Sequence, residues 1–225
     1  MRMGKLGILG GMGPFASAEF VKTIYERTAF DLEQQAPDLL LHSICSVPDR
    51  TESILQSHDQ LFIDHLRQNL EILAAEADRI VIACYTSHFA IPFLPAELQR
   101  KILSLIGICD RYLPANGKRY LLLATKGAYQ KRVFQPLYDR VELLDSRDLE
   151  WIHQYIYTKL KYNRGIGLFP EIYFRLKKKY GVDGVIAGCT EFHLVSKQLD
   201  KDECCMFDPL DQLIESLFIR KTVYL

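Results

Sequence analysis

The chain has 225 residues, of which 48% are hydrophobic and 25% charged. This composition is typical of a soluble globular enzyme with one large domain or two modest ones. The 28 Lys and Arg residues balance the 28 Asp and Glu residues, so we expect neither nucleic acid nor an anionic membrane surface as a partner.

Short apolar runs alternate along the chain with longer amphipathic stretches, which is typical of α/β proteins with mostly parallel sheets. The pattern predicts strands at residues 6–9, 39–44, 79–83, 102–106, 120–124, 141–144 and 184–187. It predicts helices at residues 15–27, 59–76, 128–138, 151–160, 170–180 and 210–218.

The N-terminal residues resemble a signal peptide only superficially. Arg2 and Lys5 precede an apolar stretch, but the glycines around Gly11 and a helix-like pattern after Pro14 favour a buried strand and a tight loop. No apolar run approaches the roughly 20 residues that a membrane helix needs. We therefore expect a cytoplasmic protein without a membrane association.

The cysteines of this chain do not follow a disulfide or zinc pattern. A secreted disulfide scaffold is shorter and richer in cysteine, and no two cysteines have C-x2-C spacing. We therefore expect no metal. Buried free thiols are the simplest interpretation of Cys45, Cys109, Cys204 and Cys205.

The two remaining cysteines occur in matching settings. Residues 79–86 read Arg-Ile-Val-Ile-Ala-Cys-Tyr-Thr and residues 183–190 read Asp-Gly-Val-Ile-Ala-Gly-Cys-Thr, and a histidine, His88 or His193, follows each cysteine by four positions. Either the match arose by chance or the chain forms two similar lobes. We predict two similar three-layer α/β lobes with mostly parallel sheets, and the active site in the cleft between them.

The first predicted lobe covers residues 1–98, and the second covers residues 99–205. Residues 206–225 are expected to return and pack on the first lobe, because their apolar residues have helical spacing.

Cys84 and Cys189 each follow a predicted strand and precede a predicted helix start. Functional groups of open α/β sheets collect beyond the carboxyl ends of strands, and a helix N-terminus lowers the pKa of a thiol. A thiolate and a thiol on opposite sides of a carbon would remove one proton and return another. This pair predicts the inversion of a stereocentre without a cofactor.

Two further segments have both a structural and a functional interpretation. The glycine-rich segment at residues 10–14 does not fit the dinucleotide pattern, so it forms either a tight turn or a backbone that approaches a small ligand. Arg50, within Pro-Asp-Arg-Thr at residues 48–51, belongs either to a simple turn or to a bidentate clamp for a carboxylate.

Five motifs occur in an order that resembles the aspartate/glutamate racemase family, the pyridoxal-independent amino-acid racemases. The resemblance covers residues 5–213. The motifs are Ile-Leu-Gly-Gly-Met-Gly-Pro (8–14), Pro-Asp-Arg-Thr (48–51), Ala-Cys-Tyr-Thr-Ser-His (83–88), Leu-Leu-Ala-Thr-Lys-Gly (122–127) and Gly-Cys-Thr-Glu (188–191).

The resemblance implies an amino-acid substrate, no cofactor, and a homodimer. It makes Cys84 and Cys189 the paired acid and base, and Arg50 the group that binds the side-chain carboxylate of an acidic substrate. The residues expected to contact or surround the rest of the substrate are Met12, Gly13, Tyr85, Thr86, Thr190, Glu191 and Lys161. The α-carboxylate would be held by Thr86, Thr190 and the backbone near Met12 and Gly13. Groups near the thiols would be oriented by Glu191 and His88. A lysine of the second lobe would also contact the substrate, and Lys159 is an alternative to Lys161 in this role.

The chain departs from the family pattern beside the first cysteine. The family usually has Asn there, whereas this chain has Tyr85, and Gly127-Ala128 replaces a common Gly-Thr. We expect aspartate as the substrate, with glutamate or a broader set as alternatives. Two other functions remain open: a decarboxylase or maleate isomerase of the same architecture, and an amino-acid-binding protein without catalysis.

Overall fold

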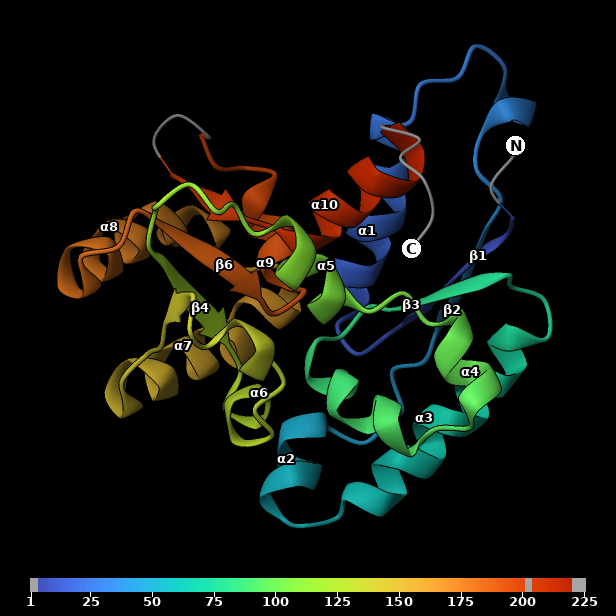
Figure 1. Cartoon of the computed structure of the whole chain (residues 1–225), viewed down its shortest axis with the longest axis horizontal. Helices are drawn as coiled ribbons and strands as arrows, with labels where there is room; N and C mark the ends of the chain where they lie inside the picture. The colour runs from blue at the N-terminus through green and yellow to red at the C-terminus, as the bar shows by residue number, and fades with distance from the viewer. Residues whose placement is uncertain (1–3, 201–203, 220–225) are drawn as a thin grey trace.

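The computed structural model describes residues 4–200 and 204–219, which form two parallel sheets flanked by helices (Figure 1). The first sheet has the order β2-β1-β3, and the second has the order β5-β4-β6-β7. The strands are β1 (Leu6–Gly10), β2 (Leu39–Ser43), β3 (Arg79–Ile82), β4 (Tyr120–Ala124), β5 (Val141–Glu142), β6 (Gly184–Gly188) and β7 (Met206–Phe207). All strand pairs are parallel, so the predicted α/β fold with two lobes is confirmed.

Helices connect the strands in both lobes. The α-helices are α1 (Pro14–Arg27), α2 (Arg50–Leu55), α3 (Asp59–Ala74), α4 (Ala96–Lys101), α5 (Leu105–Tyr112), α6 (Lys126–Gln130), α7 (Ser146–Thr158), α8 (Phe169–Tyr180), α9 (Phe192–Ser196) and α10 (Pro209–Ile214). Shorter 3-10 turns are η1 (Glu33–Gln35), η2 (Thr86–Phe93), η3 (Gln135–Leu137), η4 (Leu160–Tyr162) and η5 (Ile166–Leu168), and η6 (Glu215–Ile219) is a π-helical turn. None of the helices in the described part of the chain combines the length and apolar character that crossing a membrane requires.

One apolar core is shared by the two sheets. In β1, Leu6 and Ile8 face this central core, while Leu9 faces an outer core that is covered by α3. In β4, Leu122 faces the central core, while Leu121 faces an outer core that α7 and α8 cover. Helices α1, α5 and α10 fill the space between the sheets (Figure 1). The lobes are therefore joined by apolar packing, which explains the nearly continuous apolar strands.

The strand predicted at residues 102–106 is wrong. Ile102 forms only an isolated bridge with Ile80, and the chain then enters α5. The Ser104 hydroxyl accepts a hydrogen bond from the backbone N–H of Gly107, which caps this helix. A short apolar run does not distinguish a strand from a buried helix, and the capping serine decides for the helix.

The helix predicted at residues 128–138 is also wrong beyond its first turn. Helix α6 ends at Gln130, Arg132 adopts a φ of 50°, and the chain resumes in η3. Pro136 lacks a backbone N–H and would interrupt a helix that continued through it. The predicted helix at 210–218 is divided into α10 and η6, and the prediction omitted α2, α4, α9 and β7.

The C-terminal segment packs between the lobes through α10. This helix contacts α5 and α1, and Leu210, Leu213 and Ile214 are fully buried in the central core. The lobe boundaries given above remain a prediction, and residues 220–225 of the returning segment lie outside the described residues.

A buried polar network anchors this segment. His193 Nδ1 donates to Asp208 Oδ2 at 2.6 Å, and Ser196 Oγ donates to the same oxygen at 2.7 Å. Thr23 Oγ1 donates to the carbonyl of Glu19, so His193 Nε2 donates to Thr23 at 3.0 Å. Both ring nitrogens therefore act as donors, as in the imidazolium form. Burial alone would lower the pKa of His193, but the charge and hydrogen bond of Asp208 raise it.

We expect Asp208→Asn to destabilise the protein by about 3–5 kcal/mol near pH 6, because it leaves a buried imidazolium without its counter-charge. The pKa of His193 is higher in the folded protein than in the unfolded chain. Protonation of His193 therefore stabilises the fold fully at a pH below the unfolded-state pKa, and this stabilisation is lost as the pH rises through the folded-state pKa. The difference between wild type and variant should therefore shrink towards alkaline pH in denaturant titrations. Asp110→Asn, at an exposed ion pair with Arg140, serves as control. A pH-independent difference would contradict this assignment.

Candidate active site

The carboxyl ends of β3 and β6 meet where the two lobes join. Cys84 lies two residues beyond β3, and Cys189 lies directly after β6. The hydroxyl of Thr190 donates across the lobes to the carbonyl of Ala83 at 3.3 Å. Because each of these residues is adjacent to a cysteine, this bond brings the two cysteine-bearing turns together.

Both thiols are almost buried, with 7% of Cys84 and 8% of Cys189 exposed. The Cys189 thiol donates to Glu191 Oε2 at 2.8 Å. Burial raises the pKa of Cys189 well above its usual value, and the negative charge of Glu191 and the sulfur of Cys84 raise it further. Cys189 is therefore held as a neutral thiol at physiological pH.

The carboxyl group of Glu191 lies between Cys189 and the glycine-rich loop. Its Oε2 also lies 3.3 Å from the Thr190 hydroxyl, whose single proton can bond either this oxygen or the Ala83 carbonyl, whereas its Oε1 has no hydrogen-bond partner among the residues that the structure describes. A Cβ at Gly13 would lie 2.2 Å from Glu191 Oε1. Any side chain at this position would therefore displace the carboxyl group of Glu191.

Arg50 opens helix α2, and only 7% of the residue is exposed. Its Nη2 donates to the carbonyl of Met12 at 2.8 Å, and its Nη1 donates to that of Pro48 at 3.3 Å. Burial would lower the pKa of Arg50, but the nearby Cys84 sulfur and Asp49 carboxylate raise it on balance. The guanidinium thus remains a buried cation within electrostatic reach of Cys84.

Asp49 joins α2 to the second lobe. Its carboxylate caps α2 by accepting from the N–H groups of Thr51 and Glu52. It also accepts from the Tyr157 hydroxyl at 2.9 Å and from Lys161 Nζ at 3.1 Å. Burial would raise the pKa of Asp49, but Arg50 and Lys161 lower it to about 2. Lys161 is therefore in the site region but bound to Asp49.

Sequence reasoning missed Tyr157 and offered Lys159 as an alternative to Lys161. No motif marks Tyr157, because it is one of several aromatic residues on the amphipathic helix α7. Lys159 is exposed and lines an outer groove with Trp151 and Tyr155, separate from the cysteines. Only Lys161 of the two lysines contacts the site region.

His88 and Thr86 hold the turn that carries Cys84. The Thr86 hydroxyl lies 2.9 Å from the Thr125 hydroxyl of the second lobe. His88 Nε2 accepts from the Leu105 N–H at 3.1 Å, so its Nδ1 donates to the Cys84 carbonyl at 3.0 Å. Burial lowers the pKa of His88 to about 4, which keeps the ring neutral and makes it a structural support for the turn.

The side chain of Tyr85 points into the central core. Its ring centroid lies 5.5 Å from that of Phe134 and 6.2 Å from that of His88. Its hydroxyl has no hydrogen-bond partner within residues 4–200 and 204–219, and burial raises its pKa well above the usual value. Tyr85 can therefore offer a ligand its backbone, whereas its ring fills core space.

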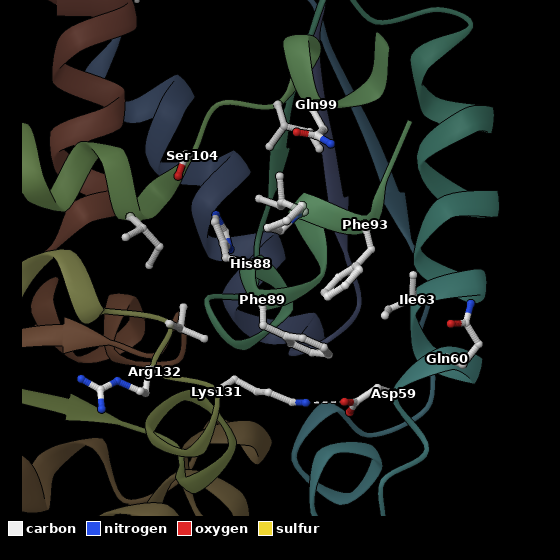
Figure 2. A pocket seen from close by; sticks show the side chains of 15 residues that line it. Asp59, Gln60, Ile63, His88, Phe89, Phe93, Gln99, Ser104, Lys131 and Arg132 are labelled. Carbon is white, nitrogen blue, oxygen red and sulfur yellow. Dashed lines mark hydrogen bonds and ion pairs between the residues drawn. The ribbon is translucent and has the colours of Figure 1, made fainter. Parts of the chain in front are cut away.

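A cavity of about 840 Å³ adjoins this region without including either cysteine (Figure 2). Phe89, Phe93 and the ion pair of Lys131 with Asp59 line it, and Figure 2 shows His88 in its wall. Because His88 also bonds to the Cys84 carbonyl, this ring contacts both the cavity and the turn that carries Cys84.

Comparison with known proteins identifies the family. The family model described as Asp/Glu/Hydantoin racemase matches residues 9–217. The chain belongs to the Asp/Glu/hydantoin racemase family. The resemblance inferred from the five sequence motifs is thereby confirmed, and the protein is assigned to the racemases, a class of isomerases.

Several solved structures have a similar fold. An aspartate racemase from Picrophilus torridus is 21% identical with a TM-score of 0.78, and the match covers 95% of this chain and 92% of that one. A putative Asp/Glu racemase from Yersinia pestis is 19% identical with a TM-score of 0.72, covering 96% and 97%. An aspartate racemase homologue from Pyrococcus horikoshii OT3 is 21% identical with a TM-score of 0.68, also covering 96% and 97%. At these identities the likeness shows the fold.

We expect Glu191→Gln to accelerate alkylation of Cys189 by iodoacetamide at mildly alkaline pH. Removing the carboxylate charge lowers the pKa of the Cys189 thiol. At a pH below the pKa, each unit by which the pKa falls increases the thiolate fraction about tenfold. Peptide mapping by mass spectrometry measures the rate, with the exposed Cys45 as internal reference and Glu150→Gln as control. An unchanged or slower reaction at Cys189 would contradict the effect of Glu191.

Proposed function

We propose that the protein racemises an acidic amino acid, with aspartate as the first candidate, and that Cys84 and Cys189 are its paired base and acid. The observation that carries the proposal is the meeting of two buried cysteines at neighbouring strand ends, with one held as a thiol. The buried guanidinium of Arg50 beside them supports an anionic substrate.

The proposed reaction needs only two proton transfers. The thiolate of Cys84 removes the α-proton, and the electrons of the C–H bond remain on the substrate, delocalised into its carboxylate. The Cys189 thiol then donates its proton to the opposite face of the same carbon. Cys84 ends as a thiol and Cys189 as a thiolate, ready for the reverse reaction. No electrons leave the substrate, so the balance requires no redox cofactor.

The substrate's two carboxylates have separate candidate partners. We assign the side-chain carboxylate to Arg50 and to Lys161, which would exchange its contact with Asp49 for one with the substrate. The hydroxyls of Thr86 and Thr190, with backbone N–H groups of the Met12 loop, are assigned to the α-carboxylate. The homodimer and the cytoplasmic location inferred from the sequence are part of the same proposal, and size-exclusion chromatography with light scattering tests the dimer.

Cys84→Ser and Cys189→Ser should each reduce racemisation by more than about 100-fold, because a hydroxyl is a far weaker base and acid than a thiol near neutral pH. Loss of optical rotation from L- or D-aspartate in deuterated buffer gives the rate, and NMR reports deuterium at the α-carbon. Cys45→Ser, at an exposed position, should leave both unchanged.

The two-thiol mechanism fails if either variant keeps the wild-type rate. Aspartate binding without deuterium uptake by the wild type would instead indicate a protein without catalysis. Release of carbon dioxide would indicate a decarboxylase.

Arg50→Lys should lower kcat/KM for aspartate by about 10- to 100-fold, since it keeps the charge but removes the fork that binds a carboxylate through two hydrogen bonds. The loss should be much smaller for alanine, which lacks a side-chain carboxylate, if alanine is turned over at all. Steady-state kinetics with both amino acids checks this. An equal loss for the two substrates would assign Arg50 to another role.

A further inference from the structure

The closed site contains one acceptor that the proposed function leaves unused. Glu191 is only 2% exposed, and its Oε2 is engaged by Cys189 and Thr190. Its Oε1 is buried but has no hydrogen-bond partner in the described part of the chain. This oxygen lies against Gly13, on the loop to which the α-carboxylate is assigned.

A buried carboxylate oxygen without a donor is unfavourable. Leaving such a group unpaired costs about 1–3 kcal/mol, and more when it is charged. The site's cations do not relieve it by direct contact: Arg50 donates to the carbonyls of Met12 and Pro48, and Lys161 donates to Asp49. The arrangement is therefore complementary to a ligand that carries a positively charged donor.

An amino acid has one group that fits this description. The carboxylates of aspartate have Arg50, Lys161 and the threonine hydroxyls as assigned partners, while its α-ammonium group has none. We propose that Glu191 Oε1 is the acceptor for the α-ammonium group of the substrate, a proposal that rests on the function proposed above. Glu191 then binds Cys189 through one oxygen and the ammonium through the other.

This geometry has a chemical consequence for the reacting carbon. The ammonium nitrogen is bonded to the α-carbon, and Glu191 bonds to the Cys189 thiol. The carboxylate of Glu191 therefore places the α-carbon beside Cys189 and next to the loop that contains Gly13. The ammonium stays protonated there, and its positive charge stabilises the negative charge that develops on the α-carbon.

The same subsite selects between substrates of the family. Hydantoins, which the family's name includes, have an uncharged ring nitrogen on the carbon that racemises. Such a nitrogen carries no positive charge, so its entry would leave Glu191 Oε1 without a charged donor. Sites with buried polar groups discriminate strongly against ligands that leave those groups unpaired. The subsite therefore specifies free α-amino acids and rejects hydantoins.

Binding of matched ligands tests the subsite separately from catalysis. Cys84→Ser protein, which should not turn over, is titrated calorimetrically with L-aspartate, L-malate and succinate. These share the carbon chain and both carboxylates but carry an ammonium, a hydroxyl or a hydrogen on the reacting carbon. We expect aspartate to bind about 10- to 100-fold more tightly than the other two, as a charged hydrogen bond predicts.

The Cys84→Ser/Glu191→Gln protein should lose this preference. Aspartate should bind about 10- to 100-fold more weakly, while malate and succinate should bind equally well or more tightly, because a repulsive charge has been removed. Cys84→Ser/Glu150→Gln is the matched control, since Glu150 is exposed and paired with Lys126. A role of Glu191 in orienting Cys189 alone would change all three affinities equally.

A preference for aspartate that survives Glu191→Gln overturns the subsite, while α-deuterium uptake by the wild type would keep the proposed function. If none of the three ligands binds and no uptake occurs, both proposals fail. A second measurement needs no variant at position 191: wild-type protein should neither bind nor deuterate L-hydantoin-5-acetate, the cyclic ureido derivative of aspartate. Turnover of this hydantoin at a rate similar to that of aspartate would also overturn the subsite.

Discussion

The bond from the Thr190 hydroxyl to the Ala83 carbonyl is the contact on which the rest of the site depends. It joins the ends of two strands that belong to different sheets, and each cysteine is the neighbour of one of the bonded residues. The shared central core beneath it holds the sheets in place, and the Thr86–Thr125 and Asp49–Tyr157 contacts also join the lobes near the two turns. Without that core the two thiols, which belong to different lobes, would not be held close together.

The site is also defined by charges that are enclosed together. The guanidinium of Arg50 and the carboxyl of Glu191 are both almost fully buried. Isolated charges are costly in such surroundings, and the cost falls when opposite charges lie within reach of one another. The burial that makes this balance necessary also keeps water away from a reacting carbon. In the proposed function, selectivity for a charged substrate and exclusion of solvent would thus have one physical origin.

Residue patterns were sufficient to predict β1 to β6, the longer helices α1, α3, α7 and α8, and the positions after β3 and β6, because apolar strands and cysteine–threonine turns are local features. Contacts between distant segments were not predictable. The hydrogen bond between Asp49 and Tyr157 joins residues 108 positions apart, and the local sequence around neither residue predicts it. Tyr85 illustrates the same limit, because its sequence position beside Cys84 could not show that its ring enters the core.

Asp49 has a consequence that extends beyond the arrangement of the site. One carboxylate both caps α2 and holds Tyr157 and Lys161 of the other lobe, and Arg50 is the next residue in the chain. Parting the lobes at this point would release two donors at once and shift the helix start that carries the guanidinium. The position of the Arg50 guanidinium therefore depends on the contacts that Asp49 makes with the second lobe.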